Sequence, residues 1–122
     1  MARFGELEAV VMDKLWSATE PLAVRTVLEL LQQERTIAYT TVMTVMERLF
    51  QKGLLTRVEA GKAFLYSPAR SRAEHTAALM ADALTDSQDS AATLVRFVEK
   101  VSAAEARQLL QALSQRGSST GG

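Results

Sequence analysis

The chain contains 122 residues, in which 14 Lys and Arg balance 14 Asp and Glu, and it has one histidine and no cysteine. This composition fits one small domain with an appended segment and excludes disulfide bridges and thiolate metal sites. Because His75 stands alone, a zinc site of the usual nitrogen and sulfur ligands cannot form within one chain. No apolar run approaches the roughly 18 residues of a membrane span. No hydrophobic signal core opens the chain, so we expect a cytoplasmic protein without membrane insertion.

Two amphipathic helices are predicted at the start of the chain. Residues 5–17 place apolar side chains at helical spacing from Leu7 to Leu15, with Trp16 beside them as a core residue, and Pro21 interrupts the pattern. A second helix is predicted from about residue 23 to about residue 34.

A third helix and a β-hairpin follow within the next 35 residues. The helix is predicted from Thr40, a suitable N-cap, to Gly53, a suitable C′ residue. Segments 54–59 and 62–67 are β-prone and turn at Ala60-Gly61. The helix has an apolar arc of Val42, Val45, Met46 and Leu49, opposite a polar side that carries threonines and Arg48. We therefore predict a mainly α fold with a small β-hairpin wing, a winged helix-turn-helix over residues 1–70.

The C-terminal part is predicted to be helical. Capping boxes at residues 71–74 and 102–105 open two helices, and a polar break at residues 86–90 precedes a short apolar segment at 94–101. About 45 residues of this kind cannot bury their apolar faces alone, so they either fold back onto the first domain or pair with a second copy. We favour a helical dimerisation domain over residues 71–116, with a flexible tail at 117–122. The expected interface residues are Leu79, Leu84, Leu94, Phe97, Val98, Leu109, Leu110 and Leu113.

The polar side of the third helix suits insertion into a DNA major groove. Threonine methyl groups can pack on thymine, and their hydroxyls can bond base edges; helix capping and a solvated surface are the alternatives. For Met43, core packing and groove contact are equally plausible. The candidates for reading bases are Thr40, Thr41, Met43 and Thr44. The candidates for holding the DNA backbone are Arg25 and Thr26 at the start of the second helix, Arg48, and Arg57 and Lys62, which are expected to flank the wing tip.

Charge supports this interpretation only modestly. Residues 36–70 contain five basic and two acidic residues, a local excess that suits a phosphate backbone. Ordinary solvated charges are the alternative, and on an edge strand such charges also oppose aggregation. Phe64 and Tyr66 are expected to pack the wing on the third helix. His75 is expected on the surface.

The assembled motifs resemble the BlaI/MecI family of penicillinase repressors from residue 4 to about residue 114. The matching segments are GELEAVVMDKLW, PLAVRTVLELL, AYTTVMTVMERLFQKGLL and LVRFVEKVSAAEARQLLQAL. The resemblance implies a homodimeric transcriptional repressor of palindromic double-stranded DNA operators, upstream of β-lactamase or related genes. It also implies inactivation by a membrane-bound sensor protease, with the scissile bond at Arg96–Phe97. A related copper-responsive branch carries C-terminal cysteine pairs, which this chain lacks.

No arrangement of residues resembles a catalytic, metal or cofactor site, so we do not expect an enzyme. Asp82, Asp86 and Asp89 lack the spacing and the glycine of a calcium loop. Two other functions remain open. One is a winged-helix regulator of another family that releases DNA when a small molecule binds between its domains. The other is a winged-helix adaptor that binds proteins and never touches DNA.

Overall fold

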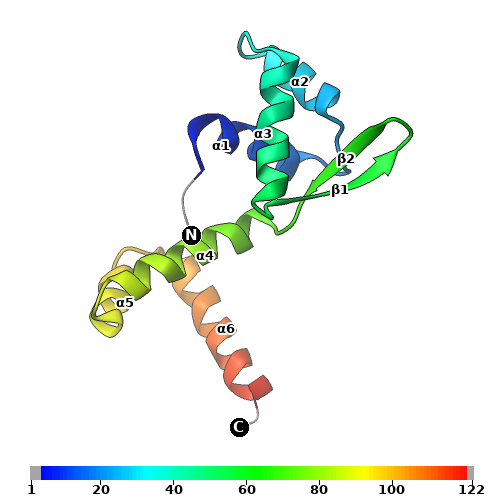
Figure 1. The fold of residues 1–122 in the computed structure, drawn as a ribbon. Helices are drawn as coiled ribbons and strands as arrows, with labels where there is room; N and C mark the ends of the chain where they lie inside the picture. The colour runs from blue at the N-terminus through cyan, green and yellow to red at the C-terminus, as the bar shows by residue number, and fades with distance from the viewer. Residues whose placement is uncertain (1–3, 121–122) are drawn as a thin grey trace. The chain divides into compact units, whose positions relative to one another are not determined.

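The computed structural model describes residues 4–120 and the side chains of residues 4–117. The chain forms two compact units, of which the first ends at Leu79 and the second begins at Met80, within a helix. The elements, labelled in Figure 1, are α1 (Glu6–Ser17), α2 (Val24–Gln32), α3 (Tyr39–Gln51), β1 (Leu55–Ala60), β2 (Ala63–Pro68), α4 (Arg72–Asp86), α5 (Ser90–Val98) and α6 (Ala103–Thr120). The predicted mainly α fold with a hairpin after the third helix is confirmed.

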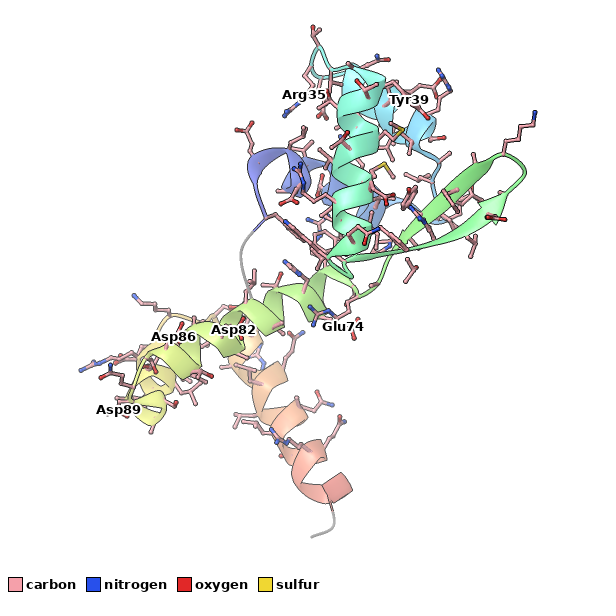
Figure 2. The ribbon with its side chains drawn as sticks, in the orientation of Figure 1. Arg35, Tyr39, Glu74, Asp82, Asp86 and Asp89 are labelled. Atoms are coloured by element: carbon pink, nitrogen blue, oxygen red, sulfur yellow. The ribbon has the colours of Figure 1, made fainter. Side chains whose placement is uncertain are left out.

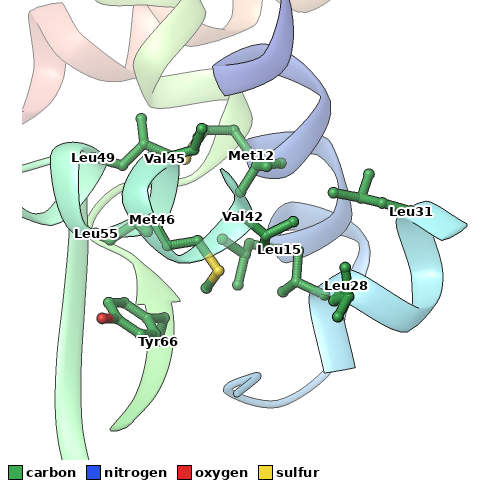
Figure 3. Close-up of a cluster of buried hydrophobic side chains, with 12 residues drawn as sticks. Met12, Leu15, Leu28, Leu31, Val42, Val45, Met46, Leu49, Leu55 and Tyr66 are labelled. Atoms are coloured by element: carbon green, nitrogen blue, oxygen red, sulfur yellow. The ribbon is translucent and has the colours of Figure 1, made fainter. Parts of the chain in front are cut away.

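One hydrophobic core holds the first unit together. The apolar faces of α1, α2 and α3 meet there, and the first residue of β1 and Tyr66 of β2 close it (Figure 3). The core residues are Val11, Met12, Leu15, Val27, Leu28, Leu31, Val42, Val45, Met46, Leu49, Leu55 and Tyr66. Trp16, which was expected in the core, packs against it while half-buried. Because this core needs all three helices and the hairpin, the wing belongs to the same cooperative structure.

The two ends of α3 follow different rules. At its C-terminus Gly53 adopts a φ of 79°, as predicted for a C′ residue. Its amide donates to the Phe50 carbonyl at 2.9 Å, and the Leu54 amide donates to the Leu49 carbonyl at 3.0 Å, which is a Schellman motif. At its N-terminus the predicted cap is wrong. Ala38, rather than Thr40, is the N-cap residue and makes no side-chain cap bond.

The wing is a two-stranded antiparallel hairpin that begins one residue later than predicted. Ala60 pairs with Ala63, so the turn consists of Gly61 and Lys62, and Gly61 has a φ of 64°. Such a two-residue turn requires positive φ, which glycine adopts without cost. An isolated bridge ties the wing to the segment before α2, since Leu22 and Tyr66 exchange backbone hydrogen bonds of 2.9 and 2.8 Å.

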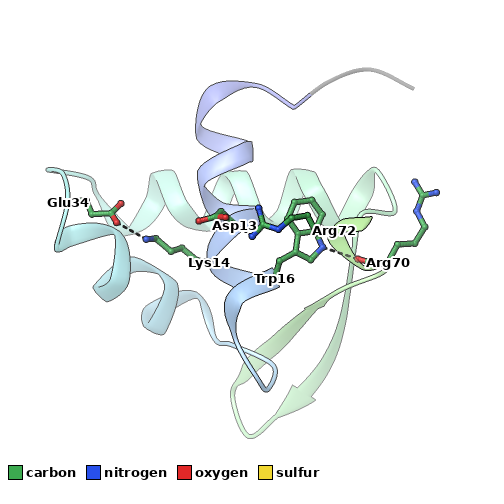
Figure 4. Close-up of polar contacts among 6 residues, drawn as sticks. All are labelled: Asp13, Lys14, Trp16, Glu34, Arg70 and Arg72. Atoms are coloured by element: carbon green, nitrogen blue, oxygen red, sulfur yellow. Dashed lines mark hydrogen bonds and ion pairs between the residues drawn. The ribbon is translucent and has the colours of Figure 1, made fainter. Parts of the chain in front are cut away.

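The start of α4 belongs to the first unit. Its capping box is confirmed, because the Ser71 amide donates to Glu74 at 2.8 Å and the Glu74 amide donates to Ser71 Oγ at 3.0 Å. The indole N–H of Trp16 donates to the carbonyl of Arg70 at 2.9 Å (Figure 4). The ion pairs of the same surface are Arg72–Asp13 at 2.6 Å and Lys14–Glu34 at 2.8 Å.

The expectation of a surface histidine is wrong. His75 is only 6% exposed, and its ring stacks on that of Phe4, with centroids 4.4 Å apart. Trp16 lies beside it, with ring centroids 5.5 Å apart. Burial in this aromatic environment, reinforced by the positive charge of Arg70, lowers the pKa of His75.

The second unit contains the end of α4, α5 and α6. Asp89 caps α5 by accepting a hydrogen bond from the Ala92 amide at 3.1 Å. The second predicted capping box is confirmed by hydrogen bonds of 2.9 and 3.1 Å between Ser102 and Glu105. We expected a flexible tail at residues 117–122, but helix α6 continues to Thr120. Residues 121–122 of that tail lie outside the described residues.

Candidate DNA-binding surface

The outward side of α3 carries all four residues that we expected to read bases. Thr40, Thr41, Met43 and Thr44 are all exposed. Met43 is 43% exposed and therefore lies outside the core, which leaves it available for groove contact. The opposite side of the helix is sealed by the core residues Val42, Val45, Met46 and Leu49. Because α3 is amphipathic, it exposes small polar groups on one side while its apolar side stays packed in the core.

Near the start of α3, α2 adds a positive charge to the same unit. Arg25 and Thr26 are exposed in the first turn of α2. The guanidinium of Arg25 lies 5.4 Å from the ring centroid of Tyr39, the first residue of α3. Tyr39 is 41% exposed (labelled in Figure 2). Sequence reasoning missed this tyrosine, although its position one residue before the threonine run could have suggested it.

Arg48 and Lys62 remain exposed, on α3 and at the wing turn respectively. A third basic residue, Lys52, is occupied within the fold, because its Nζ donates to the buried Glu8 carboxylate at 2.8 Å. That hydrogen bond, together with one from the Gly5 amide, lowers the pKa of Glu8. The local positive excess counted from the sequence therefore overstates the charge available to a ligand.

Arg57 does not flank the wing tip as expected. It lies opposite Tyr66 in the middle of the hairpin, with a side chain only 20% exposed. Its Nη1 donates to Glu47 of α3 at 2.5 Å and to the Tyr66 hydroxyl at 3.3 Å. The expected position at the tip is wrong because of the strand register, which pairs Ala60 with Ala63 and leaves residues 58–60 between Arg57 and the turn. The expected packing of Tyr66 and Phe64 between wing and helix is confirmed for the buried Tyr66, whereas Phe64 is 37% exposed.

These contacts also determine the ionisation of Glu47. Hydrogen bonds from Gln51 and then from Arg57 lower the pKa of Glu47, and the Tyr66 hydroxyl and Glu47 raise the pKa of Arg57. Glu47 therefore stays charged at neutral pH, on the same polar side of α3 as the threonines. Its charge is compensated by Arg57 rather than by solvent alone.

An open depression of about 520 Å³ lies beside the start of α3. The Nε atom of Arg35 is buried there and has no hydrogen-bond partner among the described residues; Figure 2 labels this residue. The depression is lined by Glu6, Leu7, Arg35, Thr36, Ile37, Ala38 and Thr41.

Within residues 4–120 no cluster of acidic or histidine side chains could hold a metal ion. None of the described helices is long and apolar enough to cross a membrane.

The second unit exposes many of its large apolar side chains. All residues of α5 are exposed, including Phe97 at 41%, and Leu110 of α6 is 66% exposed. Two of the expected interface residues, Leu79 and Leu84, are half-buried. Leu79 lies in the first unit and Leu84 in the second. The exposed members of that set are Leu94, Phe97, Val98, Leu109, Leu110 and Leu113. Arg96, which precedes Phe97 in the expected scissile bond, pairs with Glu99 at 3.2 Å.

Comparisons with known proteins agree with this fold. Residues 4–115 match the family described as penicillinase repressor. The chain is 48% identical over 118 residues to the transcriptional regulator BlaI of Mycobacterium tuberculosis, in both strain CDC 1551 / Oshkosh and strain ATCC 25618 / H37Rv. The matched region covers 94% of this chain and 86% of the relative. The solution structure of the DNA-binding domain of the repressor BlaI is similar, with a TM-score of 0.53 and 26% identity, covering 57% of this chain and 84% of that one. The chain therefore belongs to the penicillinase repressor family, which consists of transcriptional repressors and not enzymes.

Proposed function

We propose that this repressor binds palindromic operators as a homodimer, with α3 of each copy in the major groove. The observation that carries the proposal is the exposed row of Thr40, Thr41 and Thr44 on a helix whose other side is sealed in the core. Thirteen residues of α helix extend about 20 Å, which suits the major groove. Thymine methyls and base-edge acceptors are the groups that this surface would recognise.

Basic residues around α3 would hold the sugar-phosphate backbone. Arg25 and Thr26 stand at the start of α2, where free amides and the helix dipole favour an anion. Arg48 extends the polar side of α3, and Lys62 stands at the wing turn. Because these contacts release counterions, affinity should fall steeply with salt concentration. We propose β-lactamase-related genes as targets and the cytoplasm as the place of action.

The exposed leucines of α6 and the uncovered α5 support dimerisation through the second unit. Several large apolar side chains exposed on two consecutive helices are typical of an interaction surface. A second copy is the partner that a palindromic operator requires, because a twofold axis then relates two half-sites about 34 Å apart. We therefore propose that the apolar residues of α5 and α6 form the dimer interface.

Inactivation by a sensor protease at Arg96–Phe97 is the finer part of the proposal. Helix α5 has nine residues, none of them buried, so opening it locally would cost little. A protease could then receive the bond in an extended conformation. Incubating the intact repressor with the sensor protease of its host and measuring fragment masses tests this step. A cut at another bond, or none, would contradict it.

The main test is selection of DNA that binds the purified protein, followed by affinity measurements on the enriched site. We expect an inverted repeat whose half-site centres lie about one helical turn apart. The Thr44→Val variant keeps the methyl shape but loses the hydroxyl, and should discriminate about threefold to tenfold less between operator and mutated operator. The control is Thr19→Val, since Thr19 is exposed in the loop after α1. Unchanged preference in the Thr44 variant would remove this residue from the reading surface.

A further inference from the structure

The side chain of Arg57 is enclosed by two elements that must keep a fixed relation for DNA binding. Its guanidinium carbon lies 3.8 Å from the ring centroid of Phe50 in α3 and 4.1 Å from that of Phe64 in β2. Its Nη1 donates to Glu47 of α3 and to the Tyr66 hydroxyl of β2. Arg57 thus contacts both the third helix and the partner strand.

The rest of the hairpin has little to hold it in place. After Arg57 every residue of β1 is exposed, and Val58 reaches 61%. Isolated two-stranded hairpins are at best marginally stable in water. The attachments of the wing are therefore the Leu55 and Tyr66 side chains in the core, the Leu22 bridge and the contacts of Arg57. Arg57 is the attachment in β1 that lies nearest the turn, and so it governs the direction in which the tip projects.

We propose that Arg57 is a positioning residue rather than a phosphate ligand. It fixes the wing against α3, so that Lys62 at the turn and the threonines of α3 can meet one DNA duplex together. The inference rests on the proposed function, because it assigns a role within the same DNA-binding surface. It also gives Glu47 a role, since this carboxylate anchors Arg57 from the polar side of α3.

Arginine suits this position better than any other residue. Its planar guanidinium can stack on aromatic rings while its edge donates hydrogen bonds in the same plane. Lysine would keep the positive charge but lose the stacking and the fork of donors. A phosphate ligand tolerates that exchange, whereas a stacked positioning residue does not.

The Arg57→Lys variant therefore distinguishes the two roles in operator affinity. We expect Arg57→Lys to weaken binding about fivefold and to lower the salt slope by about one, because the displaced wing tip takes Lys62 away from the DNA backbone. Arg72→Lys is the matched control, because Arg72 is an exposed arginine that also stacks on an aromatic ring, that of Trp16, but is not among the proposed DNA contacts; it should change affinity less than twofold. Wild-type affinity or an unchanged salt slope in Arg57→Lys would overturn the proposal, because a phosphate ligand that keeps its charge gives those results.

A double-mutant cycle with Lys62→Ala tests whether Arg57 acts through the wing. Alone, Lys62→Ala should weaken binding about threefold. In the Arg57→Lys background it should have almost no further effect, because the displaced tip no longer reaches the backbone. Independent, multiplicative losses would overturn the proposal.

Amide hydrogen exchange in the DNA-free protein separates this inference from the proposed function. In both Arg57→Lys and Glu47→Gln, the amides of residues 57–66 should exchange about tenfold faster while those of α1 and α3 stay protected. Unchanged exchange in the wing would overturn the positioning role even if DNA binding is confirmed. If the natural protein binds no DNA, faster wing exchange still supports the role of Arg57, and only the proposed function fails.

Discussion

The imidazole of His75 stacks on the ring of Phe4 with an interplanar angle of 9° and a centroid separation of 4.4 Å. This contact joins the start of α4 to the residues before α1. The buried Nε2 of His75 has no hydrogen-bond partner among the described residues. The site therefore favours a neutral imidazole, in keeping with the lowered pKa of His75.

The stability of the first unit should consequently fall in mild acid. With a folded-state pKa below the unfolded value of about 6.5, the unfolded chain binds a proton first as pH falls. The contribution of the neutral ring is therefore complete above about pH 6.5 and declines below it. Urea unfolding at pH 7.5 and 5.5 measures the change. His75→Phe, which preserves the stacking, should be less sensitive to pH, and equal sensitivity would contradict the assignment.

Truncating Leu49 should strongly destabilise the first unit. Leu49 is fully buried in the core, and removal of such a side chain costs about 2–5 kcal/mol. Met43→Ala, on the exposed side of the same helix, should cost under about 1 kcal/mol. Denaturant unfolding of the two variants compares them, and similar losses would show that the two sides of α3 are not distinct.

Gly53→Ala should destabilise the protein by about 1 kcal/mol through backbone conformation alone. Gly53 has a φ of 79°, and an added Cβ would meet no atom within 4 Å, so crowding contributes nothing. Gly5→Ala is the control, because Gly5 has a φ of −65° that any residue adopts. The difference in midpoint of urea unfolding tests this, and equal effects would argue against the Schellman cap as the cause.

Leu110→Glu should convert the proposed dimer into a monomer. A charge at this position would have to be buried in the interface without a partner. The control is Val58→Glu, which introduces the same charge in place of a similarly exposed apolar residue of the wing. It should leave the molecular mass of the dimer in solution unchanged. Sedimentation equilibrium at several concentrations distinguishes the outcomes. A Leu110 variant that stays dimeric would move the interface away from α6.

Signals that act within a few residues determined most of the local structure. Both capping boxes, the glycine that ends α3 and the order of helices and hairpin were predicted correctly, because each depends on bonds among neighbours in the sequence. The apolar arc of α3 likewise identified its buried side. The exposure of Thr40, Thr41 and Thr44 follows from that arc, since residues opposite it have no core to face.

Only the tertiary structure decided the positions of Arg57 and His75. Each side chain is surrounded by residues of another element, Glu47 and Phe50 of α3 around Arg57, and Phe4, which precedes α1, beside His75. Periodicity predicts which side of an element is apolar, but it does not reveal which distant group lies across from a given residue. Packing of the wing on α3 drew the side chain of an arginine expected at the wing tip into contacts within the fold, and packing of α4 on the first residues buried an expected surface histidine.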